Sequence, residues 1–192
     1  MYIVGITGAS GSIIGIKIIE KLLGLGLKTG VIVSNNGYKT LSHELKVDAD
    51  IVKIIHERLP QADLSLLSKF SVDDFFCSPA TGNSNWEALI IAPCSMNTLS
   101  AIACGCCDNL IKRAAAVALK ENRKLILVPR ESPLSLIHLK SLLAVKEAGV
   151  DIVLPVPEFY SFPETVDDVV DSVVNRTLQL LNVDSERSFF GE

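Results

Sequence analysis

The stretch from Ile90 to Arg113, IIAPCSMNTLSAIACGCCDNLIKR, decides how this chain folds. The apolar run over 88–92 predicts a buried strand that stops at Pro93, and the small polar residues after it lead into a helix over 97–104. A strand that feeds a helix N-terminus presents free backbone N–H groups and the positive end of the helix dipole. We therefore expect an anion site here, most often one for a phosphate.

Length and composition favour one domain with a substantial core, because 48% of the 192 residues are hydrophobic and 21% are charged. The net charge of −4 argues against a nucleic-acid surface. No run approaches the roughly 20 apolar residues of a membrane helix. The first residues, Met1 to Gly5, already read as a strand and not as a targeting segment. We therefore expect a cytoplasmic protein with no membrane span and no nucleic-acid partner.

The five cysteines predict reduced thiols, because their number is odd and the chain is rich in core residues. Cys104 and Cys107 have C-x-x-C spacing, but no second pair and no nearby histidine completes a set of zinc ligands. We expect small buried thiols along a helix, and no metal.

Strands that alternate with helices predict βαβ units. The expected strands cover 2–7, 28–34, 68–72, 88–92, 124–128 and 151–154. The expected helices cover 13–25, 35–45, 49–58, 97–104, 109–121, 135–148 and 165–181. The fold class is then α/β: a three-layer, doubly wound, mostly parallel sheet of the Rossmann-like or flavodoxin-like kind. It forms a single domain over 1–183, followed by a polar C-terminal tail over 184–192, and its ligand should lie at the carboxyl ends of the strands.

The turn after the first strand, GASGS over 8–12, is small and rich in hydroxyl groups. Ser10 stands where a dinucleotide turn has its second glycine, and Ser34 ends the second strand where a ribose-binding carboxylate is expected. Ser12 breaks the G-x-S-x-G pattern of a nucleophile elbow. The turn suits a mononucleotide phosphate or the edge of a flavin, and a tight turn without a ligand remains the alternative.

Basic residues provide candidates for holding an anion. Four lie along one predicted helix, where each is expected to be solvated: Lys112, Arg113, Lys120 and Arg123. Arg130 differs, because it directly follows a buried strand and starts at the edge of the sheet. Glu44 and Glu131 are candidates for proton transfer, and the three histidines are expected to be structural.

A set of motifs spans nearly the whole chain, to about residue 183. They are GITGASG over 5–11, APCS over 92–95, TLS over 98–100, DNLI over 108–111, RAA over 113–115, ALKE over 118–121, LVPRESPLS over 127–135, His138-Leu139, Pro157, Phe159-Tyr160, Pro163, Asp167-Asp168 and Arg176. In this order they resemble the UbiX-type flavin prenyltransferases, and the VPRESPLS block is the most specific part.

The resemblance implies a fold, a reaction and an assembly. Members bind FMN and join a dimethylallyl group from dimethylallyl monophosphate to N5 and C6 of the reduced flavin, without a metal. The product, prenylated FMN, then serves a UbiD-type decarboxylase. The assembly is usually a homo-oligomer, a dodecamer built from trimers.

The resemblance also implies residue roles. The flavin-binding positions are Gly8, Ala9, Ser10, Ser34, Ser95, Met96, Asn97, Thr98, Arg113 and Arg130. The positions that hold the allylic phosphate are Lys120, Arg130, Tyr160 and Arg176. The catalytic positions are Ser10, Glu44 and Glu131, which move protons, together with Lys120.

Two alternatives stay open at this point. An FMN-dependent cysteine-type decarboxylase of the phosphopantothenoylcysteine or lantibiotic class would use an early histidine as base, and His43 is poorly placed for that. A non-catalytic FMN carrier would not need the phosphate-holding set. Departures from the family pattern include Phe75, where some members carry a tryptophan, and Thr81-Gly82-Asn83, which replaces a serine-rich loop.

Overall fold

The computed structural model describes residues 1–183, and within them one parallel sheet carries the fold. Its strands are β1 (Tyr2–Ile6), β2 (Thr29–Val33), β3 (Leu67–Phe70), β4 (Ala88–Cys94), β5 (Lys124–Pro129) and β6 (Asp151–Ile152). They lie in the order β3-β2-β1-β4-β5-β6, and every neighbouring pair is parallel. The order reverses between β1 and β4, which is where open α/β sheets bind ligands. The predicted doubly wound sheet is confirmed.

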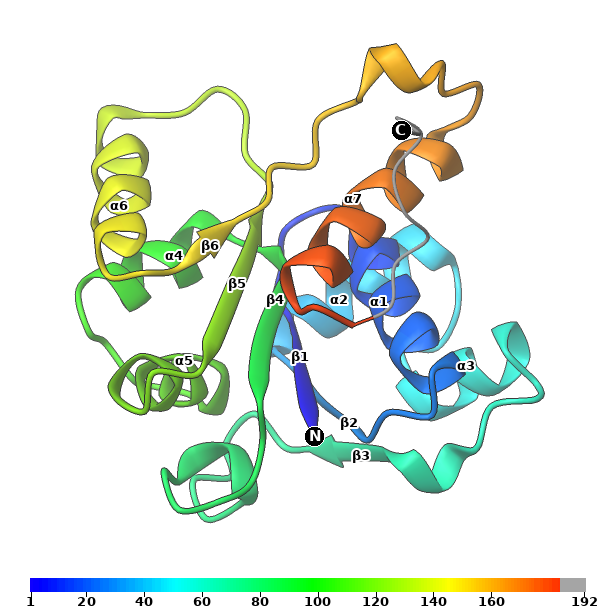
Figure 1. Cartoon of the computed structure of the whole chain (residues 1–192), viewed down its shortest axis with the longest axis horizontal. Coiled ribbons are helices and arrows are strands. Elements are labelled where there is room, and N and C mark those ends of the chain that lie inside the picture. Colours follow the sequence, from blue (N-terminus) through cyan, green and yellow to red (C-terminus); the bar gives the residue numbers. More distant parts are fainter. Residues whose placement is uncertain (184–192) are drawn as a thin grey trace.

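Helices cover both faces of the sheet, which gives three layers (Figure 1). One face carries α1 (Ser12–Gly24), α2 (Asn35–Leu45), α3 (Ile51–Arg58) and α7 (Val166–Leu180). The other carries α4 (Met96–Ala103), α5 (Leu110–Lys120) and α6 (Leu136–Glu147). Three short 3-10 turns complete the described elements: η1 (Leu64–Leu66), η2 (Ser78–Ala80) and η3 (Phe159–Ser161).

The central strands are buried on both sides, as expected for a parallel sheet covered by helices. Successive side chains alternate between two cores: Val4 of β1 and Ile90 of β4 pack among α1, α3 and α7, whereas Ile3 and Leu89 pack against α4 and α5. This double burial explains why both strands read as continuous apolar runs in the sequence.

Several predicted boundaries were wrong. β4 does not stop at Pro93 but continues through a cis Ala92–Pro93 bond to Cys94, with a register shift against β5 that accommodates the missing proline N–H. α5 ends at Lys120, so Arg123 lies beyond the helix. β6 pairs over two residues only, and the predicted tail over 184–192 lies outside the described residues.

Gly15 lets α1 pack directly on the sheet. A Cβ at this position would lie 2.3 Å from the carbonyl oxygen of Ala92 and 2.9 Å from the side chain of Ile6. Gly15→Ala must therefore push α1 away from β4, and we expect it to lower the free energy of unfolding by about 3 kcal/mol. Gly24→Ala is the matched control, because nothing lies within 4 Å of its Cβ. Gly24→Ala should raise the free energy of unfolding, measured in urea, by about 0.5–1 kcal/mol. Equal effects of the two substitutions would contradict the close packing of α1 on the sheet.

Candidate active site

A cavity of about 630 Å³ lies at the carboxyl ends of β1, β2 and β4, a volume typical of small-molecule sites. Its lining residues are Thr7, Gly8, Ser34, Asn35, Asn36, Val72, Asp73, Ser95, Asn97, Thr98, Asp108, Asn109 and Lys112. We call it the first cavity. It contains five of the residues expected at a flavin, namely Gly8, Ser34, Ser95, Asn97 and Thr98.

The N-termini of three helices meet at the first cavity. Ser34 caps α2 by accepting from the N–H of Gly37 at 3.0 Å, Ser95 caps α4, and Asn109 caps α5. Each cap satisfies one backbone donor and leaves others of the first turn directed outward. Because the positive ends of three helix dipoles converge, the cavity favours an anion or a ligand rich in acceptors.

Gly8 and Thr7 bring the end of β1 close to its neighbours. A Cβ on Gly8 would lie 2.7 Å from Cβ of Asn36, so only glycine allows this approach. Thr7 Oγ1 donates to the Pro93 carbonyl at 2.8 Å and accepts from the N–H of Ser95 at 2.7 Å. This link fixes β1 to the start of α4. Sequence reasoning included Thr7 in a motif but gave it no role in the site, because nothing local indicates these two contacts.

Lys112 is buried, contrary to the expectation of a solvated side chain. Its side chain is only 8% exposed, and Nζ lies 2.7 Å from Oδ1 of Asp108. Both residues line the first cavity, so the ion pair forms part of its wall. Sequence reasoning also left Asn109 out of the site, although an asparagine directly before a helix is a recognisable capping signal.

The N-terminus of α1 is occupied by a carboxylate of the same chain. Gly11 precedes the helix at a positive φ of 102° and supplies no side-chain cap. Glu44, from α2, accepts instead from the N–H groups of Gly11 at 3.0 Å and Ser12 at 2.8 Å. Burial raises the pKa of Glu44, but hydrogen bonds from Ser10, Ser12 and Gly11 outweigh burial and hold the pKa below its ordinary value. The turn over 8–12 therefore brings Ser10 and Glu44 together.

The cap supplied by Glu44 predicts a pH-dependent stability. Because the folded-state pKa is depressed, the stabilisation is fully present above the ordinary value of 4.5 and is lost as pH falls through the lower folded value. Glu44→Gln should cost roughly 1–2 kcal/mol at pH 7 in urea unfolding. The difference in the free energy of unfolding between wild type and Glu44→Gln should narrow steadily below about pH 4.5. A gap that widened in acid would contradict an ionised cap.

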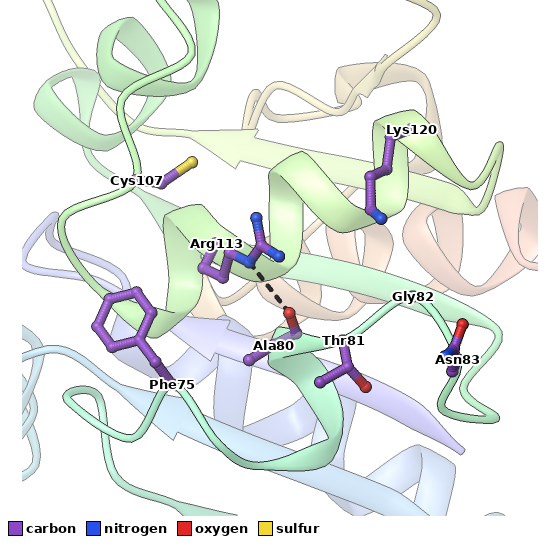
Figure 2. Close-up of a pocket in the computed structure, with 8 residues that line it drawn as sticks. All are labelled: Phe75, Ala80, Thr81, Gly82, Asn83, Cys107, Arg113 and Lys120. Carbon is purple, nitrogen blue, oxygen red and sulfur yellow. Dashed lines mark hydrogen bonds between the residues drawn. The ribbon is translucent and has the colours of Figure 1, made fainter.

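A second cavity, of about 590 Å³, lies between α5 and the segment over 80–83 (Figure 2). Its lining residues are Phe75, Ala80, Thr81, Gly82, Asn83, Cys107, Arg113 and Lys120. Arg113 and Lys120 stand two helical turns apart on α5, and Figure 2 shows both side chains on the side facing the 80–83 segment. Arg113 Nε donates to the Ala80 carbonyl at 3.0 Å, and Lys120 Nζ lies 3.0 Å from Glu121. This cavity thus offers two cations to an anion.

The remaining expected residues lie elsewhere. Arg130 and Glu131 follow β5 and are exposed, and Oε1 of Glu131 accepts from the N–H of Ser132 at 3.1 Å. Tyr160 and Arg176 belong to η3 and α7 and are also exposed. A hydrogen bond with Glu158 raises the pKa of Tyr160, while the nearby charge of Arg176 acts in the opposite direction.

Within residues 1–183, the lining of the two cavities includes none of those four side chains. α7 packs on the α1 face of the sheet and α5 on the other, so Tyr160 and Arg176 stand apart from Lys120 in one chain. Met96 and Ala9 are buried and adjoin, along the chain, residues that line the first cavity, and Ser10 is hydrogen-bonded to Glu44. A single subunit therefore brings five of the ten expected flavin positions together in the first cavity but divides the phosphate-holding positions.

The cysteines are free, as expected, but Cys104 and Cys106 are exposed and not buried along a helix. His43 is exposed in the last turn of α2, and His138 takes part with Ser135 in the capping box of α6. In the described part of the chain, no cluster of three or more metal-ligating side chains occurs, and no helix is long and apolar enough to cross a membrane.

Comparison with known proteins places this geometry in a family. A family model described as Flavoprotein matches residues 1–178. A relative from Halalkalibacterium halodurans named flavin prenyltransferase UbiX is 39% identical over 186 residues, which cover 97% of this chain and 90% of the relative.

Two solved structures are similar over nearly their full length. A dodecameric FMN-dependent UbiX-like decarboxylase from Escherichia coli has a TM-score of 0.87 and 38% identity, with 97% of each chain covered. AnUbiX in complex with FMN and dimethylallyl pyrophosphate has a TM-score of 0.88 and 36% identity, covering 100% of this chain and 98% of the other. With a parallel sheet whose switch point carries five of the residues expected at a flavin, this chain belongs to the UbiX flavin prenyltransferases of the Flavoprotein family.

Proposed function

We propose that the chain transfers a dimethylallyl group from dimethylallyl monophosphate to N5 and C6 of reduced FMN, and so makes prenylated FMN. The observation that carries this proposal is the pair of cavities flanking α5, one with three helix N-termini and the other with Arg113 and Lys120. Two adjacent sites of this kind suit two ligands that each bear a phosphate. The complex of AnUbiX with FMN and an allylic pyrophosphate supports the same pairing.

The first cavity fits FMN in size and in chemistry. Hydroxyl and amide groups of Ser34, Ser95, Asn97 and Thr98 and the uncrowded backbone at Gly8 would hold it, with Ala9, Ser10 and Met96 shaping the adjoining loops. When bound in reduced form, FMN supplies the two nucleophilic positions, N5 and C6. The protein's task is then to hold the flavin, to bring the allylic carbon near it and to exclude water.

Basic side chains would stabilise the phosphate as it leaves. When the allylic C–O bond breaks, its electron pair leaves with the phosphate oxygen, and preorganised cations stabilise that charge. We assign this role to Lys120, Arg130 and Arg176, with the hydroxyl group of Tyr160 as a further donor and Arg113 beside the flavin. Phe75 places an aromatic ring at the second cavity, which suits the cationic character of the allyl group.

For the second bond, the double bond of the transferred group would have to gain a proton, which makes its branched carbon electrophilic, and C6 would have to lose one; the site therefore needs groups that give and take protons. Glu44 is ionised and hydrogen-bonded to Ser10, so a proton passed to the Ser10 hydroxyl can reach a carboxylate. Glu131, exposed after β5, is the second candidate acceptor. We propose that these groups, and no metal, move the protons.

Neighbouring copies of the chain would complete the site. Exposed apolar side chains occur in two places, on and around α6 and in the segment before α7: Leu134, Leu136, Ile137, Leu139, Leu143, Leu154, Val156, Phe159 and Phe162. Large apolar side chains exposed in such number suit interfaces between chains. Together with the dodecameric relative, these side chains support a homo-oligomer, a dodecamer of trimers, in which Tyr160 and Arg176 of one copy approach Lys120 of another.

The product would be handed to a UbiD-type decarboxylase. We propose the cytoplasm as the place of action, since free thiols persist in reducing compartments and all five cysteines are unpaired. Addition of the product to an apo form of such a decarboxylase should restore decarboxylation, and FMN alone should not.

Anaerobic incubation of the protein with reduced FMN and dimethylallyl monophosphate tests the function directly. Mass spectrometry should reveal a flavin heavier by one dimethylallyl unit. A non-catalytic carrier would return FMN unchanged. A cysteine-type decarboxylase would instead release carbon dioxide from a peptidyl or pantothenoyl cysteine, a reaction for which exposed His43 is the weak candidate base.

A further inference from the structure

The loop over 80–84 forms one wall of the second cavity, and Arg123, which does not line that cavity, binds the loop. Arg123 Nη2 donates to the carbonyl oxygens of Gly82 and Ser84, the latter at 2.8 Å. Its guanidinium carbon also lies 4.2 Å from the centroid of the Trp86 ring. Arg123 is not among the residues that line either cavity of the described chain, so it can influence a bound ligand only through this loop.

The same loop touches the cations of the cavity. Arg113 binds the Ala80 carbonyl (Figure 2), and the loop's tip packs against the end of α5. A Cβ on Gly82 would lie 2.3 Å from Oε1 of Glu121 and 3.1 Å from Nζ of Lys120. The position of the loop and the position of the Lys120 ammonium group are therefore set together.

We propose that Arg123 is a positioning residue for the allylic phosphate. By fixing two carbonyl groups and stacking on Trp86, it holds the 80–84 loop in place before the ligand arrives, so that the ligand does not have to order it. Arginine suits this role because Nη2 reaches both carbonyl oxygens while the planar guanidinium group stacks on the ring, and a lysine ammonium group has no plane to stack. The inference rests on the proposed function, since it concerns the cavity assigned to that phosphate.

Arg123→Lys tests the proposal, because it keeps the charge and removes the planar guanidinium group that stacks on Trp86. We expect KM for dimethylallyl monophosphate to rise about tenfold, with kcat within about twofold and the Kd for FMN unchanged. Backbone amides over 80–84 should exchange hydrogen faster in the ligand-free variant. Arg58→Lys is the control, because Arg58 is likewise held by a partner in the chain, the Glu20 carboxylate, and lines neither cavity. It should leave all four quantities unchanged.

Two outcomes would overturn the inference. An unchanged KM in Arg123→Lys would show that the loop does not shape the phosphate site. A joint fall in kcat, FMN affinity and melting temperature would show a purely structural role. Failure of the proposed function is distinguishable, because the wild-type protein itself would then yield no heavier flavin.

Discussion

Lys120→Ala should lower kcat/KM for dimethylallyl monophosphate by about 10²–10³-fold, while the Kd for FMN stays within about twofold of wild type. Lys120 offers a cation at the second cavity and does not line the first. Loss of its ammonium group removes charge stabilisation from the departing phosphate and leaves the flavin contacts intact. Anaerobic steady-state kinetics with mass detection of the flavin product measures the first quantity, and fluorescence titration measures the second.

Lys124→Ala is the control for that experiment. Lys124 is a nearby exposed lysine that pairs with Asp151 and lines neither cavity. It should keep wild-type kcat/KM. If Lys120→Ala lowered kcat/KM by less than about threefold, the role assigned to Lys120 would be wrong. A loss of FMN binding would instead show that the two cavities are not independent sites.

Ile137→Glu should break the assembly and remove nearly all activity. Ile137 is 71% exposed on α6, amid the apolar surface that we assign to subunit contact. A carboxylate buried there without a partner costs several kcal/mol, which exceeds what a neighbouring subunit can offset. Native mass spectrometry should show small species in place of a dodecamer. Activity should fall because Tyr160 and Arg176 no longer reach Lys120 of another copy.

Val52→Glu supplies the comparison, because Val52 is an apolar residue on α3, 39% exposed and away from this surface. Val52→Glu should leave the mass of the native assembly unchanged. Circular dichroism should show that both variants remain folded. An intact assembly in Ile137→Glu would mean that α6 faces solvent and that the phosphate-holding residues meet in some other way.

Local signals made much of the site predictable. Ser34 and Ser95 each stand between an apolar strand and a helix, and a capping residue in that place needs only its neighbours in the chain to act. The alternation of strands and helices likewise predicted the parallel sheet and a ligand site at the carboxyl ends of its strands. These features follow from short-range patterns, so they could be read without coordinates.

Contacts between distant segments could not be read in this way. Lys112 looked like one more surface cation, but packing of α5 turns its side chain into the cavity wall beside Asp108. Glu44 caps a helix that begins far earlier in the chain, and no periodicity reports that contact. The separation of Tyr160 from Lys120 depends on which face of the sheet each helix covers, which the pattern of apolar residues left undetermined.

One helix, α5, contributes to the walls of both cavities, and this has a thermodynamic consequence. Its neighbouring residues Lys112 and Arg113 line the first and the second cavity, respectively. Any tilt of α5 induced by one occupant must alter the room left for the other. By linkage, if bound flavin changes the affinity for the allylic phosphoester by some factor, the bound phosphoester must change the affinity for the flavin by the same factor.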